Sequence, residues 1–290
     1  MNRVKRQLAP YFLVLPGGLW LLLFFAIPMI AMLSLSLQQG DVVYGYRFTF
    51  HWQNYTDAIS GYHDQLIRSL IYAGIGTLLL IALAFPVAYW IAFYGGKRKP
   101  TYLFLLLLPF FVSFVIRTVQ WNFILGTNGL LFGPLKNLGL LSEDFRVLKT
   151  PVAVIAGITY NYMPFAALPL YVALERIDRR LVEAAKDLYA SKPMAFRKVV
   201  LPLSVPGIFA AVILTFVPAT GDYINSVILG GGGPGTTMIG VLIQSYFLVQ
   251  HEYPIAAALS VILMVSMLVL AIAYARVLGT EDDTIAAAAA

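Results

Sequence analysis

LVEAAKDLYASKPMAFRKVVLPLSVPGI (residues 181–208) is a charged, amphipathic stretch that separates two long apolar segments. Its opening residues, LVEAAKDL, place two leucines and two alanines on one helical face through their spacing of three and four positions. Pro193 interrupts this pattern, and MAFRKVVLPL predicts a second helical stretch that leads into the next apolar segment. We therefore expect a hairpin of two short helices, joined at both ends to long apolar helices.

The composition of the whole chain is typical of a membrane protein. Of its 290 residues, 60% are hydrophobic and only 12% are charged, whereas soluble domains carry about 25% charged residues. Several apolar segments reach the roughly 20 residues that a helix needs to cross a bilayer. The sequence contains no cysteine, which excludes disulfides, thiolate metal sites and cysteine nucleophiles. These features predict an all-α polytopic membrane protein.

Six apolar segments are predicted to span the membrane. They cover residues 11–37, 69–94, 102–125, 151–173, 202–222 and 255–278. We expect them to form one transmembrane domain over residues 1–285, and we take the five alanines at 286–290 as a tail outside it.

Basic residues are shared unevenly between the two sides of the predicted domain. Six spans put both termini on one side, and that side carries 14 of the 20 lysines and arginines. They are Arg3, Lys5, Arg6, Lys97, Arg98, Lys99, Arg176, Arg179, Arg180, Lys186, Lys192, Arg197, Lys198 and Arg276. Because positively charged loops stay in the cytoplasm, the termini and the 174–201 loop that holds the hairpin are predicted to be cytoplasmic.

The hairpin resembles the EAA motif of ABC importer permeases, in which Glu-Ala-Ala is followed four positions later by Gly, then by an aliphatic residue and a final Leu-Pro. The corresponding positions here are Glu183, Ala184, Ala185, Tyr189, Val199, Leu201 and Pro202. Tyr189 departs from the motif, because it stands where the family usually has Gly. Glycine adopts positive φ without a steric penalty, whereas a tyrosine there is strained. The alternatives are a turn of different shape or a changed strength of coupling.

This resemblance implies the type I ABC importer permease fold, with six transmembrane helices and a cytoplasmic coupling-helix hairpin. It implies no enzyme activity and no cofactor in this chain, because ATP and Mg would be bound by a separate ATPase. The glycine-rich segment at 230–237, GGGGPGTT, agrees, since it lacks the Gly-Lys-Ser/Thr of a P-loop. The residues expected to couple to the ATPase are Glu183, Ala184, Ala185, Asp187, Leu188, Tyr189, Ala190 and Ser191.

The resemblance also implies a set of partners in the bacterial inner membrane. These are two ATPase subunits, a second homologous permease subunit, an extracytoplasmic substrate-binding protein and membrane lipid, with no nucleic acid. The spermidine/putrescine branch of the family is the most similar, through LLLPFFVSFVIRTVQW (106–121), GITYNYMPFAALPLYVALERID (157–178) and VPATGDYINSVILGGGGPGTTMIG (217–240). We therefore expect polyamines as the cargo.

A site for a polyamine needs negative charge and aromatic rings inside the membrane. Asp222 is the acidic residue that falls clearly within or at the end of a predicted span, and Pro218 and Gly221 predict a break there that would turn its carboxylate into the pore. Tyr223, Trp121, Phe111 and Tyr160 are candidates for cation–π contact with an ammonium group. The alternatives are a carboxylate at the outer interface and aromatic residues in ordinary packing.

Arg117, in the third predicted span, leaves the cargo open. It pairs with Asp222 or with outer-loop carbonyls if its role is structural, whereas an arginine facing the pore alone favours an aminophosphonate, a sulfate-like anion or a metal chelate. A secondary transporter would need ionisable residues in several spans, and the chain has few. An intramembrane enzyme would need paired catalytic groups or a His/Glu metal set, and the sequence offers neither.

Overall fold

The computed structural model describes residues 14–288, with side chains as far as Arg276. The chain folds as two compact units, one made of its two ends up to His63 and from Leu242 onward, and the other of Asp64–Val241. The basic N-terminal residues Arg3, Lys5 and Arg6, and the last two alanines of the predicted tail, lie outside the described residues. The preceding alanines of that tail belong to the final helix.

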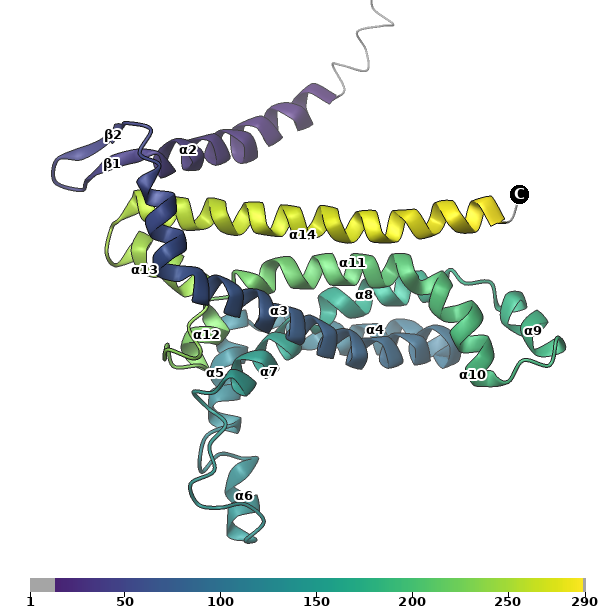
Figure 1. Ribbon diagram of the computed structural model, residues 1–290. Helices are drawn as coiled ribbons and strands as arrows, with labels where there is room; N and C mark the ends of the chain where they lie inside the picture. Colours follow the sequence, from purple (N-terminus) through teal and green to yellow (C-terminus); the bar gives the residue numbers. More distant parts are fainter. Residues whose placement is uncertain (1–13, 289–290) are drawn as a thin grey trace, which may run out of the picture. The chain divides into compact units, whose positions relative to one another are not determined.

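The first unit pairs the first and last apolar helices of the chain. Its elements are the π-helix η1 (Leu22–Ala26), α2 (Ile27–Ser36), β1 (Gln38–Asp41), β2 (Gly45–Phe48), the start of α3 (Gln53–Tyr94), most of α13 (Ile239–Leu248) and α14 (Tyr253–Ala288). α14 contacts α2, and in Figure 1 the two helices are closest at the end of α2 that leads into β1 and diverge from there. The two strands form an antiparallel hairpin, whose turn is fixed because Asp41 Oδ1 accepts hydrogen bonds from the amides of Val43 and Tyr44.

α3 is a 42-residue helix with one interruption. Tyr62 has non-helical torsion angles, with φ −133° and ψ 16°, which mark a kink between the amphipathic segment before it and the apolar segment after it. The helix begins at Gln53, well before residue 69, because the segment QNYTDAIS contains no proline or glycine to prevent it. Beyond Tyr62 the helix continues through Pro86 to Tyr94.

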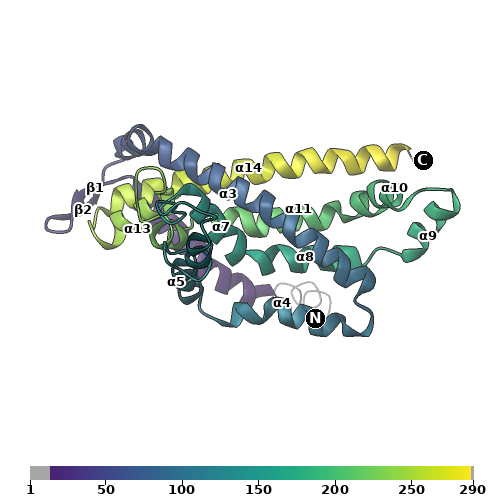
Figure 2. The same ribbon diagram turned by 90° about the horizontal axis from the view of Figure 1, so that it is seen from below.

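The second unit contains the remaining helices. They are the rest of α3, the 3-10 helix η2 (Gly96–Arg98), α4 (Lys99–Leu107), the 3-10 helix η3 (Leu108–Phe111), α5 (Phe114–Ile124), α6 (Phe132–Asn137), α7 (Pro151–Asn161), α8 (Met163–Glu175), α9 (Arg179–Asp187), α10 (Lys192–Ala195), the π-helix η4 (Phe196–Val200), α11 (Leu201–Thr220) and α12 (Ile224–Ile228). In both views α8 and α11 lie side by side, α9 lies beyond one end of this pair, and α5 lies toward the other end (Figures 1 and 2).

Small residues let the helices of the second unit approach closely. α3 presents Ala73, Ala84, Ala88 and Ala92, all buried, to the core around α8. Where α8 and α11 pack, a Cβ added at Gly207 would lie 2.3 Å from the Cβ of Ala173. Interfaces between membrane helices are typically built in this way, because dispersion contacts replace the hydrophobic effect inside lipid.

Two of the predicted spans are broken helices. Residues Gly96–Phe111 and Phe114–Ile124 are bent by 88° at Val112 and Ser113, and Pro151–Asn161 and Met163–Glu175 are bent by 47° at Tyr162. By contrast, α11 is continuous from Leu201 to Thr220 despite Pro206 and Pro218. By length and composition, four helices of the described part of the chain suffice to cross a membrane, or up to six if each bent pair is one span.

Candidate functional site

The breaks of three helices come together in the second unit. They are Ser113 before α5, Tyr162 between α7 and α8, and residues 221–223 between α11 and α12. Side chains next to the breaks touch: the rings of Phe114 and Tyr162 lie 5.8 Å apart, and Asn161 donates a hydrogen bond to Asn225. Interrupted helices within a membrane are tolerated where the freed backbone is buried in protein or lines a cavity. In transporters they often build the substrate site.

A buried polar network joins the three breaks. The Asp222 carboxylate accepts hydrogen bonds from the backbone amide of Asn225 (3.0 Å) and from Asn225 Nδ2 (2.5 Å). Asn161 Nδ2 donates to Asn225 Oδ1 and to Thr118 Oγ1, each at 3.0 Å. Thr118, Asn161 and Asn225 are fully buried, and Asn161 Oδ1 is buried without a partner. The network ties α5, α7 and α12 together through polar side chains alone.

Asp222 therefore lies at a helix break, but its side chain is only 5% exposed. Its carboxylate is held by Asn225 and lies close to the Tyr162 hydroxyl. It is not paired with Arg117 among the described contacts, because the Arg117 guanidinium lies over the rings of Phe110 and Phe114. The Asp222 carboxylate is thus buried beside Asn225 and Tyr162.

The aromatic candidates fall into separate places. The rings of Trp121 and Tyr160 pack edge to face, with centroids 5.0 Å apart. Tyr223 follows Asp222 in the chain and is 42% exposed. Phe111 is 80% exposed and lines a cavity to which Trp121, Tyr160 and Tyr223 do not contribute. The structure brings Trp121 and Tyr160 together and sets Phe111 apart from them.

That cavity, which we call the aromatic pocket, has a volume of about 450 Å³. Its lining consists of Phe110, Phe111, Val112, Ser113, Phe114, Arg117, Tyr162 and Phe165. Five of these side chains are aromatic, and one is a buried cation. Tyr162 belongs both to this pocket and to the surroundings of Asp222, so the pocket and the buried network share a wall.

Several of these residues were missed by the sequence prediction. Phe110, Phe114, Tyr162 and Phe165 lie within the stretches that resemble the polyamine branch, but nothing in their spacing separates them from ordinary apolar packing. Asn161, Tyr162 and Asn225 carried a signal, because polar groups beside a proline or glycine inside an apolar segment indicate a break.

The predicted hairpin is present as α9 and α10. Asp178 caps α9 by accepting a hydrogen bond from the amide of Arg180 at 2.9 Å. At the other end, the amide of Tyr189 donates to the Lys186 carbonyl at 2.9 Å, and the amide of Ala190 donates to the Ala185 carbonyl at 3.0 Å. This pair of hydrogen bonds is the Schellman arrangement, which requires a left-handed residue at its turn.

Tyr189 is that left-handed residue, with φ +60°. The expected strain is therefore confirmed, because an L-residue with a Cβ disfavours this conformation. Its side chain is 98% exposed, and Leu188 beside it is also exposed. The tip of the hairpin thus presents a leucine and a tyrosine to its surroundings without packing them.

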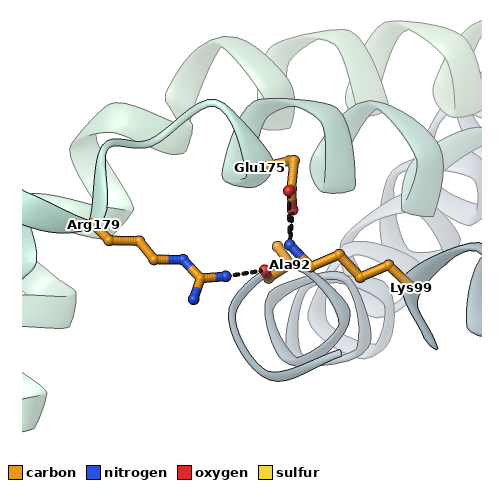
Figure 3. A network of polar contacts seen from close by, with 4 residues as sticks. All are labelled: Ala92, Lys99, Glu175 and Arg179. Atoms are coloured by element: carbon orange, nitrogen blue, oxygen red, sulfur yellow. Dashed lines mark hydrogen bonds and ion pairs between the residues drawn. The ribbon is translucent and has the colours of Figure 1, made fainter. Parts of the chain in front are cut away.

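Two polar contacts fix the base of the hairpin to neighbouring helices (Figure 3). Arg179 Nη2 donates to the Ala92 carbonyl at the end of α3 at 3.1 Å, and the Arg179 guanidinium lies 5.9 Å from the Phe93 ring. Lys99 Nζ lies 2.7 Å from the Glu175 carboxylate, which joins the start of α4 to the end of α8. The first residue of α9 is therefore attached to α3, and the end of α8, just before the hairpin, is attached to α4.

Comparison with known families matches residues 84–278 to the family described as "Binding-protein-dependent transport system inner membrane component". The chain belongs to this family. It is a permease subunit of an ABC importer and resides in the inner membrane as a multi-pass protein. Among the described residues, no group of three or more histidine, aspartate or glutamate side chains is arranged to hold a metal ion.

Relatives of the permease cover most of its length. It is 36% identical over 258 residues to the "Spermidine/putrescine transport system permease protein PotB" of Haemophilus influenzae, which covers 89% of this chain and 90% of the relative. It is 35% identical to the Escherichia coli protein of the same name, over 89% of this chain and 93% of the relative.

A solved structure shows the same fold. A bacterial ABC transporter "involved in the import of the acidic polysaccharide alginate" contains a chain that superposes with a TM-score of 0.75 at 20% identity. The superposition covers 94% of the permease and 96% of that chain. The permease accordingly has the type I ABC importer permease fold.

Proposed function

We propose that the permease carries polyamines, spermidine or putrescine, into the cytoplasm. The observation that supports this cargo is the identity of 35–36% over 89% of the chain to permeases named for spermidine and putrescine. The fold neighbour imports an acidic polysaccharide, so the fold alone does not select a cargo. The side chains of the cargo site must therefore determine which cargo is carried.

The cargo site we propose is centred on Asp222. Its carboxylate supplies the negative charge that an ammonium group needs in a medium of low dielectric constant. The rings of Tyr223, Trp121 and Tyr160, and that of Phe111 in the aromatic pocket, are proposed to hold the cationic groups and the methylene chain through cation–π and apolar contacts. Asp222 is buried and lies close to Tyr162, and in this proposal a movement of that tyrosine gives the cargo access to the carboxylate.

The hairpin is proposed to be the docking surface for an ATPase subunit. The exposed tip at Leu188 and Tyr189 fits a groove on a partner, and the polar residues of α9 line its flanks. The remaining contact residues we propose are Glu183, Ala184, Ala185, Asp187, Ala190 and Ser191. ATP and Mg are bound by the ATPase in this scheme, and closure of two ATPase copies moves the hairpin as a lever.

The proposed function also implies how the permease is oriented in the membrane and which other proteins it works with. The hairpin and both termini face the cytoplasm, since they carry most of the basic residues of the sequence. An extracytoplasmic binding protein delivers the cargo from the opposite side. A second, homologous permease subunit completes the translocation path.

The test is ATP hydrolysis by the assembled transporter. The permease is purified with the partner chains encoded beside it and reconstituted into lipid nanodiscs. We expect the ATPase rate to rise when binding protein loaded with spermidine or putrescine is added, and to stay at the basal rate with binding protein supplied with sulfate or an aminophosphonate. Stimulation by the anions but not by polyamines would contradict the proposed cargo.

One observation favours an anionic cargo as the second candidate. Arg117 is a buried cation on the wall of the aromatic pocket, and a cation in such a place attracts a carboxylate, sulfate or phosphonate. The same nanodisc experiment separates the two cargo classes, because each predicts stimulation by a different set of compounds.

A further inference from the structure

Arg117 is a buried cation in the second unit with an unpaired donor. Its side chain is 7% exposed, and its Nε is buried without a hydrogen-bond partner. The guanidinium carbon lies 5.2 Å from the centre of the Phe110 ring and 5.7 Å from that of Phe114. Two aromatic faces therefore hold the charge where a carboxylate or carbonyls would usually do so.

This arrangement is unusual for an arginine with a structural role. A buried guanidinium has five N–H donors, and buried donors in folded proteins nearly always have acceptors. Within membranes, cationic side chains normally pair with anionic side chains or with backbone carbonyls. The Asp222 carboxylate lies close to Tyr162, which lines the same pocket as Arg117, yet no described contact joins Arg117 to Asp222. Among the described contacts, the partners of the Arg117 charge are therefore two aromatic rings of the pocket.

We infer that Arg117 occupies the aromatic pocket as a substitute for a cargo ammonium group and must be displaced when cargo binds. This inference rests on the proposed polyamine cargo. The faces of Phe110 and Phe114 hold the guanidinium by the same cation–π attraction that would hold an ammonium group. The two cations repel each other within one pocket, so that they exclude each other.

Such competition makes Arg117 a specificity-determining residue. A cargo with one ammonium group gains only the contact that Arg117 gives up. A polyamine has a second ammonium group, which is attracted to the Asp222 carboxylate beside Tyr162 while the first replaces the guanidinium. The arginine therefore raises the KM for amines with one ammonium group more than the KM for polyamines.

Transport by the reconstituted complex tests the inference through matched variants. Arg117→Met keeps the length of the side chain and removes its charge, Arg117→Lys keeps a cation, and Arg47→Met removes an exposed arginine of β2 as the control. We expect Arg117→Met to lower the KM for putrescine by about threefold to tenfold, as the loss of one competing cation–π contact predicts. It should also allow transport of butylamine, while Arg117→Lys and Arg47→Met behave as the wild type.

The same measurements can contradict the inference about Arg117. A KM for putrescine that rises in Arg117→Met, or transport that is lost although the complex assembles, would overturn the inference. A wild-type complex that transports no polyamine would instead overturn the proposed function, so the two failures are distinguishable. Anion transport that is lost in Arg117→Met and kept in Arg117→Lys would assign the arginine to an anionic cargo.

A second measurement needs no variant and covers the case in which Arg117→Met does not fold. Phenylglyoxal modifies accessible arginines, and mass spectrometry quantifies the modified peptide that contains Arg117. If cargo displaces the guanidinium, loaded binding protein should increase the modification of Arg117 in the wild-type complex relative to unloaded binding protein. Protection of Arg117 by cargo, or no change, would overturn the inference.

Discussion

The Lys99 ammonium group lies 2.7 Å from each carboxylate oxygen of Glu175, and this ion pair connects the first turn of α4 to the last residue of α8. Arg179, four residues further along the chain, donates to the Ala92 carbonyl at the end of α3. The base of the hairpin is therefore attached to three helices. We regard this attachment as the path by which a force on α9 reaches the membrane helices.

The ion pair should contribute to coupling more than to stability. Because the Glu175 side chain is 40% exposed, we expect Lys99→Glu and Glu175→Lys each to lower the free energy of unfolding by only about 0.2–1 kcal/mol. Both should lower the number of cargo molecules transported per ATP, and the double charge swap should restore it. Lys97→Glu, next to the pair, is the control. Unchanged coupling in both single variants would exclude this path.

Replacing Tyr189 by glycine should stabilise the end of α9. Tyr189 adopts φ +60°, which costs an L-residue roughly 1 kcal/mol or more relative to glycine. Hydrogen exchange at the amides of Tyr189 and Ala190 reports on this turn, and Tyr189→Gly should slow exchange of the Ala190 amide about fivefold to tenfold. Tyr189→Ala keeps the strain and removes the ring, so its exchange should not slow. Equal slowing in both variants would attribute the effect to the ring.

Gly157 permits α7 and α12 to approach each other. A Cβ at this position would lie 2.5 Å from both Asn225 Oδ1 and Leu229 Cδ1. Gly157→Ala should therefore lower the free energy of unfolding of the permease in the complex by about 1–3 kcal/mol. A Cβ at Gly235 would meet nothing within 4 Å, and Gly235→Ala serves as the control. Thermal unfolding of the purified complex measures both. A Gly157→Ala complex as stable as the wild type would show that α12 shifts freely.

Asp222→Asn should reduce polyamine uptake without preventing assembly. Asparagine keeps the size of the side chain and an oxygen for the Asn225 amide, but it loses the charge that an ammonium group needs. We expect uptake to fall about tenfold or more, in line with the loss of a hydrogen bond to a charged group. Asp57→Asn, in an exposed turn of α3, is the control. Wild-type uptake by Asp222→Asn would remove Asp222 from the cargo site.

Local rules predict the hairpin well, because the features that form it are local. The spacing of LVEAAKDL and the proline after it are contained in about a dozen residues, and α9 and α10 follow from them. The left-handed turn at Tyr189 was indicated only by the resemblance to a motif with glycine at this position. The length of each apolar segment likewise indicates where the long helices run, since a helix needs about 20 apolar residues to cross a bilayer.

The bends and the site depend on contacts that are distant in sequence. Pro109 precedes an 88° bend, whereas Pro206 and Pro218 leave α11 continuous, because the surroundings of each proline decide whether the helix breaks. Pro218 and Gly221 correctly mark the end of α11 near Asp222. The direction of its carboxylate, however, is set by Asn225 and Tyr162, and nothing in the sequence pairs Tyr162 with Asp222, which lies 60 positions further along the chain.

The most direct test of the account is the position of residue 189 in the assembled transporter. The permease has no native cysteine, so Tyr189→Cys introduces a single thiol at the tip of the hairpin. We predict that a membrane-impermeant maleimide labels this thiol only from the cytoplasmic side, and that a bifunctional cross-linker joins it to the ATPase subunit. Labelling from the outer side, or cross-linking to no ATPase although the complex hydrolyses ATP, would contradict the account.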